Sequence, residues 1–290
     1  MGLGTAQLGM NYGISNVSGK FPESGIKDLL DYASSVGMMT LDTAGSYGES
    51  ETVLGRAMHG EQRFLVVTKT IPLAVDKITP AELRAVDDCL RRSLERLQCR
   101  SVYGILVHKP ENLLCAGGDS LYELLNRWKQ EGMVEKIGTS LYDGDQLRKV
   151  AGQFSLDLVQ IPLSVFDQRM LTDGTLRSLK NAGVEVHVRS VFLQGLLLMG
   201  ADELPAPMKR FAARIAEYRR YLADLNCSPL EAALGFVKRL AEIDVALIGI
   251  NSRAQLQECI ESYDRAEPLD LSRFACDDLD LIDPRRWTSP

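Results

Sequence analysis

The chain has 290 residues, of which 45% are hydrophobic and 25% charged, as in an ordinary globular protein. This composition excludes intrinsic disorder, which requires few apolar residues and a strong charge imbalance. The formal net charge of −6 and the pI near 5.3 disfavour nucleic acid and anionic membranes as partners, since both attract basic surfaces.

The sequence also argues against a membrane span, a secretion signal and a metal centre. No run approaches the ~18 apolar residues of a membrane helix, and residues 1–5 lack the basic and apolar regions of a signal peptide. The six cysteines include no C-x-x-C pair, and the three histidines lie far apart. We therefore expect a cytoplasmic protein with reduced thiols and no structural metal.

Short apolar runs with strand character alternate with amphipathic helical patterns along the chain. The predicted strands are residues 2–6, 38–42, 64–69, 102–108, 136–140, 156–161, 184–190 and 245–250. Apolar strands that alternate with helices indicate a parallel sheet covered by helices. Eight such units in 290 residues predict one (β/α)₈ TIM barrel domain over residues 1–290, with a doubly wound open sheet as the alternative.

Four helix starts carry capping signals. Residues 79–82 and 228–231 combine a capping Thr or Ser with Pro at the first helical position and Glu two residues later. Residues 120–123 and 252–255 show a Ser followed by Glu or Gln at the same spacing. An extra helix is predicted over residues 208–225, and the tail from residue 266 to 290 is expected to pack over the mouth or side of the barrel.

Ionisable side chains stand where three neighbouring strands end, the rim that carries the active site of such barrels. Asp42, Lys69 and His108 end the second, third and fourth predicted strands, and Tyr47 follows five residues after Asp42. A nearby ammonium lowers the pKa of a phenol, a carboxylate holds the ammonium, and a neutral imidazole can orient a carbonyl oxygen. Each residue alone is more often structural, but their joint placement predicts proton transfer to a carbonyl under reduction.

The run LDTAGSYGESETVLG, residues 41–55, closely resembles the signature of aldo-keto reductases. Residues 67–69, 103–108, 132–140, 159–162 and 249–258 are similar to later strand segments of that family. The resemblance implies an NAD(P)H-dependent oxidoreductase that reduces an aldehyde or ketone to an alcohol. It makes Tyr47 the general acid, Asp42 and Lys69 the groups that tune it, and His108 the group that orients the small-molecule carbonyl substrate.

The same resemblance implies a set of cofactor contacts spread around the barrel mouth. Ser140 and Gln160 match the positions that hold the nicotinamide carboxamide. The full set is Thr5, Asp42, Ser140, Gln160, Arg189, Ser190, Phe192, Gln194, Gly249, Asn251, Gln255 and Glu258. The helix start after the eighth strand would also offer unpaired backbone N–H groups to an anion.

Three positions depart from the family pattern. Leu141 stands where an Asn is frequent, Cys259 where an Asn usually ends the last segment, and Arg189 where an aromatic residue usually stacks on the nicotinamide. A guanidinium can stack as well, or bind an anionic or sugar-derived substrate. NADPH is favoured over NADH, with Arg253 as the residue that could hold the 2′-phosphate of NADP.

Two other functions remain open from the sequence. A Schiff-base lyase or aldolase would use Lys69 as its nucleophile, although the neighbouring Asp42 would favour the unreactive ammonium. A cofactor-sensing regulatory subunit would keep the binding residues and lose turnover, although the intact set of Tyr47, Lys69 and His108 argues against that loss.

Overall fold

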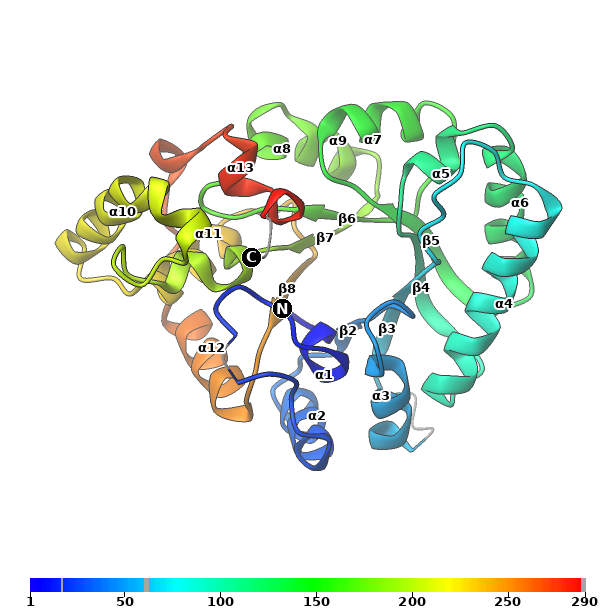
Figure 1. The fold of residues 1–290 in the computed structure, drawn as a ribbon, viewed down its shortest axis with the longest axis horizontal. Helices are drawn as coiled ribbons and strands as arrows, with labels where there is room; N and C mark the ends of the chain where they lie inside the picture. The colour runs from blue at the N-terminus through cyan, green and yellow to red at the C-terminus, as the bar shows by residue number, and fades with distance from the viewer. Residues whose placement is uncertain (17, 60–62, 288–290) are drawn as a thin grey trace.

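Eight parallel strands form a closed barrel in the computed structural model (Figure 1). The structure describes residues 1–16, 18–59 and 63–287. Each strand pairs with the next in the chain, and β1 pairs with β8 to close the ring. The strands are β1 (Gly2–Gly4), β2 (Thr40–Asp42), β3 (Leu65–Lys69), β4 (Val102–Val107), β5 (Val134–Ser140), β6 (Leu158–Pro162), β7 (Glu185–Arg189) and β8 (Val245–Gly249). All eight predicted strands are confirmed, and so is the (β/α)₈ barrel.

Helices connect the strands and surround the barrel (Figure 1). They are α1 (Ala6–Gly9), α2 (Ile26–Ser35), α3 (Ser50–Met58), α4 (Pro80–Leu97), α5 (Glu111–Leu114), α6 (Gly118–Gln130), α7 (Gly144–Ala151), α8 (Arg169–Thr172), α9 (Thr175–Asn181), α10 (Ala212–Asp224), α11 (Pro229–Lys238), α12 (Arg253–Arg265) and α13 (Leu279–Ile282). Short 3₁₀ turns are η1 (Glu23–Gly25), η2 (Leu193–Leu198), η3 (Ala206–Phe211), η4 (Ser272–Phe274) and η5 (Pro284–Arg286).

The strands are buried on both faces, which explains why they read as continuous apolar runs. Every residue of β6 is buried, for example. A large apolar core fills the space between strands and helices. A separate small cluster of Val67, Leu106 and Leu158, with Tyr103 beside it, packs apart from that core. The barrel is therefore filled by side chains and presents its polar strand ends at one rim.

A charged network closes the opposite end of the barrel, near the starts of β4, β5 and β7. Glu185 accepts hydrogen bonds from Tyr103 Oη at 2.6 Å and from Lys136 Nζ, and it shares one with His187 Nε2 at 2.6 Å. Burial raises the pKa of Glu185, but the hydrogen bonds from His187, Lys136 and Tyr103 outweigh it and lower that pKa to about 2. The carboxylate is thus charged and fully engaged at neutral pH.

The helix starts follow their capping signals in three of four cases. Thr79 accepts from the Ala81 amide, Ser228 from the Glu231 amide and Ser252 from the Gln255 amide. The predicted start at Ser120 is wrong, because α6 begins at Gly118. Gly117 adopts a left-handed φ of 83°, which glycine takes without steric penalty, and turns the chain into the helix two residues early.

The later part of the chain supplies two additions to the barrel. The predicted helix over residues 208–225 is present as η3 followed by α10. The tail packs over the mouth on the β6 and β7 side, as expected (Figure 1). There the Cys276 amide donates to the Phe166 carbonyl at 2.9 Å, and the Arg285 guanidinium lies 3.4 Å from the centre of the Tyr142 ring. Residues 288–290 of the tail lie outside the described residues.

The described residues contain neither a membrane-spanning helix nor a cluster of metal ligands. Within residues 1–16, 18–59 and 63–287, no helix has the length and apolar character needed to cross a bilayer. The same residues contain no group of three or more His, Cys, Asp or Glu side chains arranged to hold a metal ion.

Candidate active site

The four predicted catalytic side chains meet at the carboxyl ends of β2, β3 and β4. Lys69 Nζ donates to Asp42 Oδ1 at 2.7 Å and to the Thr43 carbonyl at 3.0 Å. The same Nζ lies 4.9 Å from the centre of the Tyr47 ring. The Tyr47 and His108 rings meet edge to face, with centroids 6.4 Å apart. The geometry thus assembles the group that the sequence placed on neighbouring strand ends.

A tight turn after β2 presents Tyr47 to this cluster. The Tyr47 amide donates to the Ala44 carbonyl at 2.9 Å, and Gly48 adopts a left-handed φ of 60°. A Cβ at Gly48 would lie 2.5 Å from the Gly9 carbonyl oxygen, so only glycine lets this turn approach the loop after β1 so closely.

Thr5 joins the ends of β1 and β2. Its hydroxyl donates to the Asp42 carbonyl at 2.8 Å and lies 2.8 Å from Ser50 Oγ. The side chain is fully buried. The sequence predicts a cofactor contact at Thr5; its hydroxyl is hydrogen-bonded within the protein, and the residue also lines the cavity described below.

Glu51 is a buried carboxylate behind the Tyr47 turn, and sequence analysis did not identify it. It accepts from Thr68 Oγ1 at 2.7 Å and from Arg96 Nη1 at 3.4 Å, with 1% of the residue exposed. These bonds hold the start of α3 against β3, next to Lys69. An acidic residue in the first turn of a helix is common, so no pattern in the sequence distinguishes this role.

The charges within the cluster determine the protonation of Lys69 and Tyr47. Burial alone lowers the pKa of Lys69, but the Asp42 carboxylate and Tyr47 outweigh it and raise that pKa, so the ammonium persists at neutral pH. Burial raises the pKa of Tyr47, and the Lys69 charge offsets this only in part. The expected lowering of the phenol pKa was therefore wrong in its net direction, because burial exceeds the effect of the ammonium.

His108 is a neutral imidazole. Burial, followed by the positive charge of Lys69, lowers its pKa to about 4. Its Nδ1 is buried and has no hydrogen-bond partner in the part of the chain that the structure describes. The ring therefore stays uncharged near neutral pH, with one nitrogen as donor and the other as acceptor, and is suited to hydrogen bonding with a neutral oxygen.

A cavity of about 660 Å³ extends from Asp42 and Tyr47 across the barrel rim to α11 and α12. Most residues predicted to contact the cofactor line it: Thr5, Asp42, Gln160, Arg189, Ser190, Phe192, Gln194, Gly249, Asn251, Gln255 and Glu258. Ser140 is not among the lining residues; it is buried at the end of β5, in register with Gln160. Sequence analysis missed Gln7, Ser15 and Arg265, which come from a loop and helix faces without a distinctive pattern.

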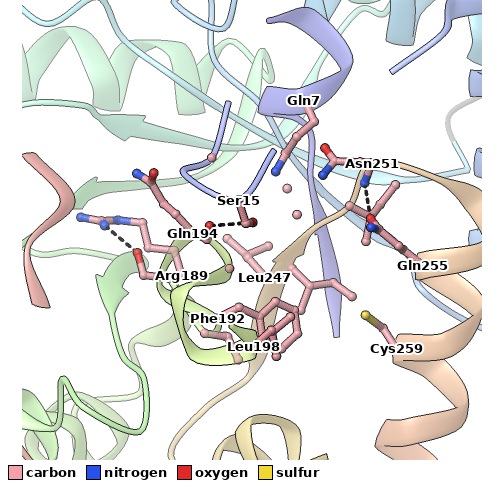
Figure 2. A pocket seen from close by; sticks show the side chains of 18 of the residues that line it. Gln7, Ser15, Arg189, Phe192, Gln194, Leu198, Leu247, Asn251, Gln255 and Cys259 are labelled. Carbon is pink, nitrogen blue, oxygen red and sulfur yellow. Dashed lines mark hydrogen bonds between the residues drawn. The ribbon is translucent and has the colours of Figure 1, made fainter. Parts of the chain in front are cut away.

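The loop after β7 closes against the loop after β1. The Ser15 amide and hydroxyl both donate to the Gln194 carbonyl, at 3.4 and 3.1 Å, and Figure 2 shows the two residues meeting in the cavity. Leu193 and Gln194 adopt left-handed φ values of 47° and 54°. Such values are uncommon for residues other than glycine, and they allow the loop to turn back on itself.

The start of α12 lines the other part of the cavity. Ser252 caps the helix, and the Gln255 side chain accepts from the Asn251 amide at 2.7 Å (Figure 2). Asn251 Oδ1 is buried and lacks a hydrogen-bond partner among the described residues. Arg253 does not line the cavity; it pairs with Asp28 at 3.2 Å.

Arg189 extends from the end of β7 toward the end of β5. Its Nη2 donates to the Leu141 carbonyl at 3.2 Å, and its Nη1 to Ser190 Oγ at 3.4 Å. The guanidinium lies 4.4 Å from the centre of the Tyr142 ring. Arg189 therefore lines the same cavity as Asp42 and Tyr47, with its guanidinium against an aromatic ring.

The closed barrel and the tyrosine, lysine, histidine and aspartate at its rim define a TIM barrel oxidoreductase. The model of the Aldo/keto reductase family matches residues 1–275, so the chain belongs to this family and is an NAD(P)H-dependent oxidoreductase.

Three known proteins illustrate the relationship. The NADH-specific methylglyoxal reductase of Escherichia coli is 24% identical over 289 residues, which cover 89% of this chain and 87% of that protein. D-arabinose 1-dehydrogenase of Saccharomyces cerevisiae is 27% identical over 186 residues, 56% of each chain. The holo form of aldo-keto reductase AKR11C1 from Bacillus halodurans has the same fold, with a TM-score of 0.72 at 18% identity, over 94% of this chain and 89% of that one.

Proposed function

We propose that this enzyme reduces the carbonyl group of an aldehyde or ketone to an alcohol, with Tyr47 as general acid. The arrangement of Tyr47 with Lys69, Asp42 and His108 at the end of a long cavity carries the proposal. The cluster can move a proton at Tyr47 Oη, and the cavity leaves room for a hydride donor beside it.

The cavity suits a nicotinamide dinucleotide. Its volume of about 660 Å³ lies within the range of cofactor sites. A Cβ at Gly249 would lie 2.5 Å from Gln7 Nε2, so the glycine lets the Gln7 amide pack against the backbone there, and that amide lines the cavity as a polar group for a ligand. Asn251 Oδ1 is buried without a hydrogen-bond partner among the described residues, so it can accept a hydrogen bond from a ribose hydroxyl or an adenine amine. When bound, the reduced nicotinamide would supply the hydride.

Each residue of the cluster has a separate role in protonating or orienting the carbonyl oxygen. Because burial raises its pKa, Tyr47 keeps its proton until negative charge develops on the carbonyl oxygen. The Lys69 ammonium then stabilises the phenolate, and Asp42 holds that ammonium in place at 2.7 Å. Neutral His108 orients the carbonyl oxygen by hydrogen bonding.

We infer NADH as the preferred cofactor. The expectation of NADPH depended on Arg253, which pairs with Asp28 outside the cavity. Among the described residues, the arginines that line the cavity are Arg189, at its catalytic end, and Arg265, which already pairs with Glu231 at 3.5 Å. Among the described residues that line the cavity, none at the start of α12 is therefore a cation that could bind the 2′-phosphate of NADP. The relative from Escherichia coli is itself NADH-specific.

We also infer a substrate with an anionic group, such as an oxidised sugar or a keto acid. Arg189 donates two hydrogen bonds to the protein, so three of its five N–H groups have no partner among the described residues. A carboxylate or phosphate is the group that this fork of donors recognises best.

The other functions fit less well. A Schiff-base lyase requires a neutral amine, and the pair with Asp42 raises the pKa of Lys69. A regulatory subunit without turnover has no need for the protonated phenol beside a fixed ammonium. We place the enzyme in the cytoplasm, because its six cysteines are all free in the structure.

The test is a turnover assay with purified protein, NADH or NADPH, and paired aldehydes and ketones that differ only in a carboxylate. With NADH we expect the absorbance of the reduced nicotinamide to fall as substrate is reduced, and to fall faster with the carboxylated member of each pair. With Tyr47→Phe we expect no fall in absorbance. Cofactor binding without any turnover would favour the regulatory subunit, and substrate trapped on Lys69 by borohydride would favour the lyase.

A further inference from the structure

The positive charge of Arg189 would act on the ring of a bound nicotinamide cofactor; this inference rests on the proposed use of that cofactor. Arg189 lines the same end of the cavity as Asp42, Tyr47 and Gln160. Figure 2 shows its side chain extending to one side of the cavity, bonded to the neighbouring serine. A hydride donor must lie beside the carbonyl that Tyr47 protonates. The nicotinamide ring therefore belongs at the end of the cavity that Arg189 lines.

The other charges at this end cancel in pairs. Lys69 lies 2.7 Å from Asp42, and Arg285 lies 2.6 Å from Asp283, with both Asp283 oxygens engaged by the Arg285 guanidinium. His108 is neutral. Arg189 has no carboxylate partner among the described residues, since its two hydrogen bonds go to a carbonyl and a hydroxyl. The pairs leave one net positive charge, that of Arg189.

Two further groups near Tyr142 do not change this balance. Arg169 donates to the Tyr142 carbonyl and pairs with Asp167 at 2.8 Å. Glu111 is exposed and accepts from Gln146; its charge acts on Arg285, and solvent screens it.

The oxidised nicotinamide ring carries a positive charge and the reduced ring is neutral, while the rest of the dinucleotide is identical in the two forms. An unpaired guanidinium beside the ring repels only the oxidised form. An aromatic residue at the same place would act in the opposite direction, because its ring face attracts a cation. We propose that Arg189 makes this enzyme hold the reduced cofactor more tightly than the oxidised one and thereby directs it toward carbonyl reduction.

The experiment is isothermal titration of the purified protein with NADH, NAD⁺ and ADP-ribose. The ratio of the two dinucleotide dissociation constants isolates the ring, because the contributions of pyrophosphate and adenosine cancel. We expect NAD⁺ to bind at least about tenfold more weakly than NADH. Arg189→Gln and Arg189→Tyr should lower this ratio by about tenfold, mainly through tighter NAD⁺ binding, whereas Arg189→Lys should retain most of it.

Two controls separate charge at the ring from charge elsewhere. Arg265→Gln removes a cation that lines the same cavity from the last turn of α12, a 13-residue helix about 20 Å long, and should change both constants equally. Asp283→Asn frees the charge of Arg285 and should raise the ratio above that of the wild type, which tests the proposal without touching Arg189. ADP-ribose should bind all Arg189 variants with unchanged affinity.

A wild-type ratio near one, or a ratio that Arg189→Gln leaves unmoved, overturns the inference and leaves the proposed function standing. Failure of the folded wild-type protein to bind NADH, NADPH or their oxidised forms removes both.

Discussion

Gln160 on β6 donates a hydrogen bond from Nε2 to Oδ1 of Asp42 on β2, at 2.6 Å. The same oxygen accepts from Lys69 at 2.7 Å. Residues on opposite sides of the barrel mouth are thus joined through one buried carboxylate, which has two donors to fix its orientation. Gln160 also lines the cavity, so it connects the proposed cofactor site with the carboxylate that holds Lys69.

Replacing Gln160 with leucine removes one donor to a charged acceptor, an interaction that typically contributes 1.5–3 kcal/mol. We expect kcat/KM for carbonyl reduction to fall roughly ten- to hundredfold. Steady-state kinetics with reduced cofactor in excess checks this. Gln168→Leu is the matched control, because Gln168 is also buried after β6 but bonds only to backbone carbonyls of Val165 and Leu271. Equal losses in the two variants would argue for a general loss of structure.

Tyr47→Phe removes the proposed acid and leaves the ring in place. General acid catalysis contributes about 10²–10⁴-fold, so we expect kcat to fall by at least about a hundredfold with the dissociation constant of the cofactor unchanged. Single-turnover kinetics with equilibrium titration separates the two effects. A kcat within a few fold of the wild type would exclude Tyr47 as the acid.

The pKa directions predict a broad pH plateau for reduction. The pKa of Tyr47 is raised above its ordinary value of about 10, so the acid stays protonated and kcat holds through neutral pH, then falls as the phenol ionises. The pKa of His108 is about 4, so activity falls only as the pH drops toward that value and the imidazole gains a proton. A pH–rate profile with His108→Gln as comparison tests this, since the variant should lose the acidic limb. A limb near pH 6.5 in the wild type would contradict a depressed pKa.

Glu185→Gln should destabilise the barrel by about 2 kcal/mol at neutral pH, because it removes the charged acceptor of the partly exposed Lys136. The pKa of Glu185 is depressed to about 2, so its contribution is complete above the unfolded value near 4.3 and is lost as pH falls through about 2. Urea unfolding of both proteins at a series of pH values measures the difference. We expect the gap to narrow below about pH 4 and the cofactor affinity at pH 7 to stay unchanged; a gap independent of pH would show that the ionised carboxylate is not its source.

The architecture could be predicted because the buried strands are short apolar runs that alternate with helical patterns. Three neighbouring runs end at Asp42, Lys69 and His108, so the sequence alone placed these residues at one rim. It could not give the net pKa direction of Tyr47, since the burial of a side chain depends on loops from distant parts of the sequence.

Contacts between residues far apart in the sequence could not be predicted either. The bond from Gln160 to Asp42 spans 118 positions, and the bond from Ser15 to Gln194 spans 179. Neither pair has a spacing signature, because side chains that meet at a barrel rim come from separate strand ends. The start of α6 was misplaced for a local reason: Gly117 takes a left-handed φ of 83° that strains other residues, and the helix begins directly after it.

The paired hydrogen bonds from Ser15 to the Gln194 carbonyl join the loops after β1 and β7 into a bridge along the cavity. An elongated molecule bound beneath this contact would leave by sliding endwise or by parting two weak hydrogen bonds. Loop opening and product release set kcat in many enzymes with such loop contacts.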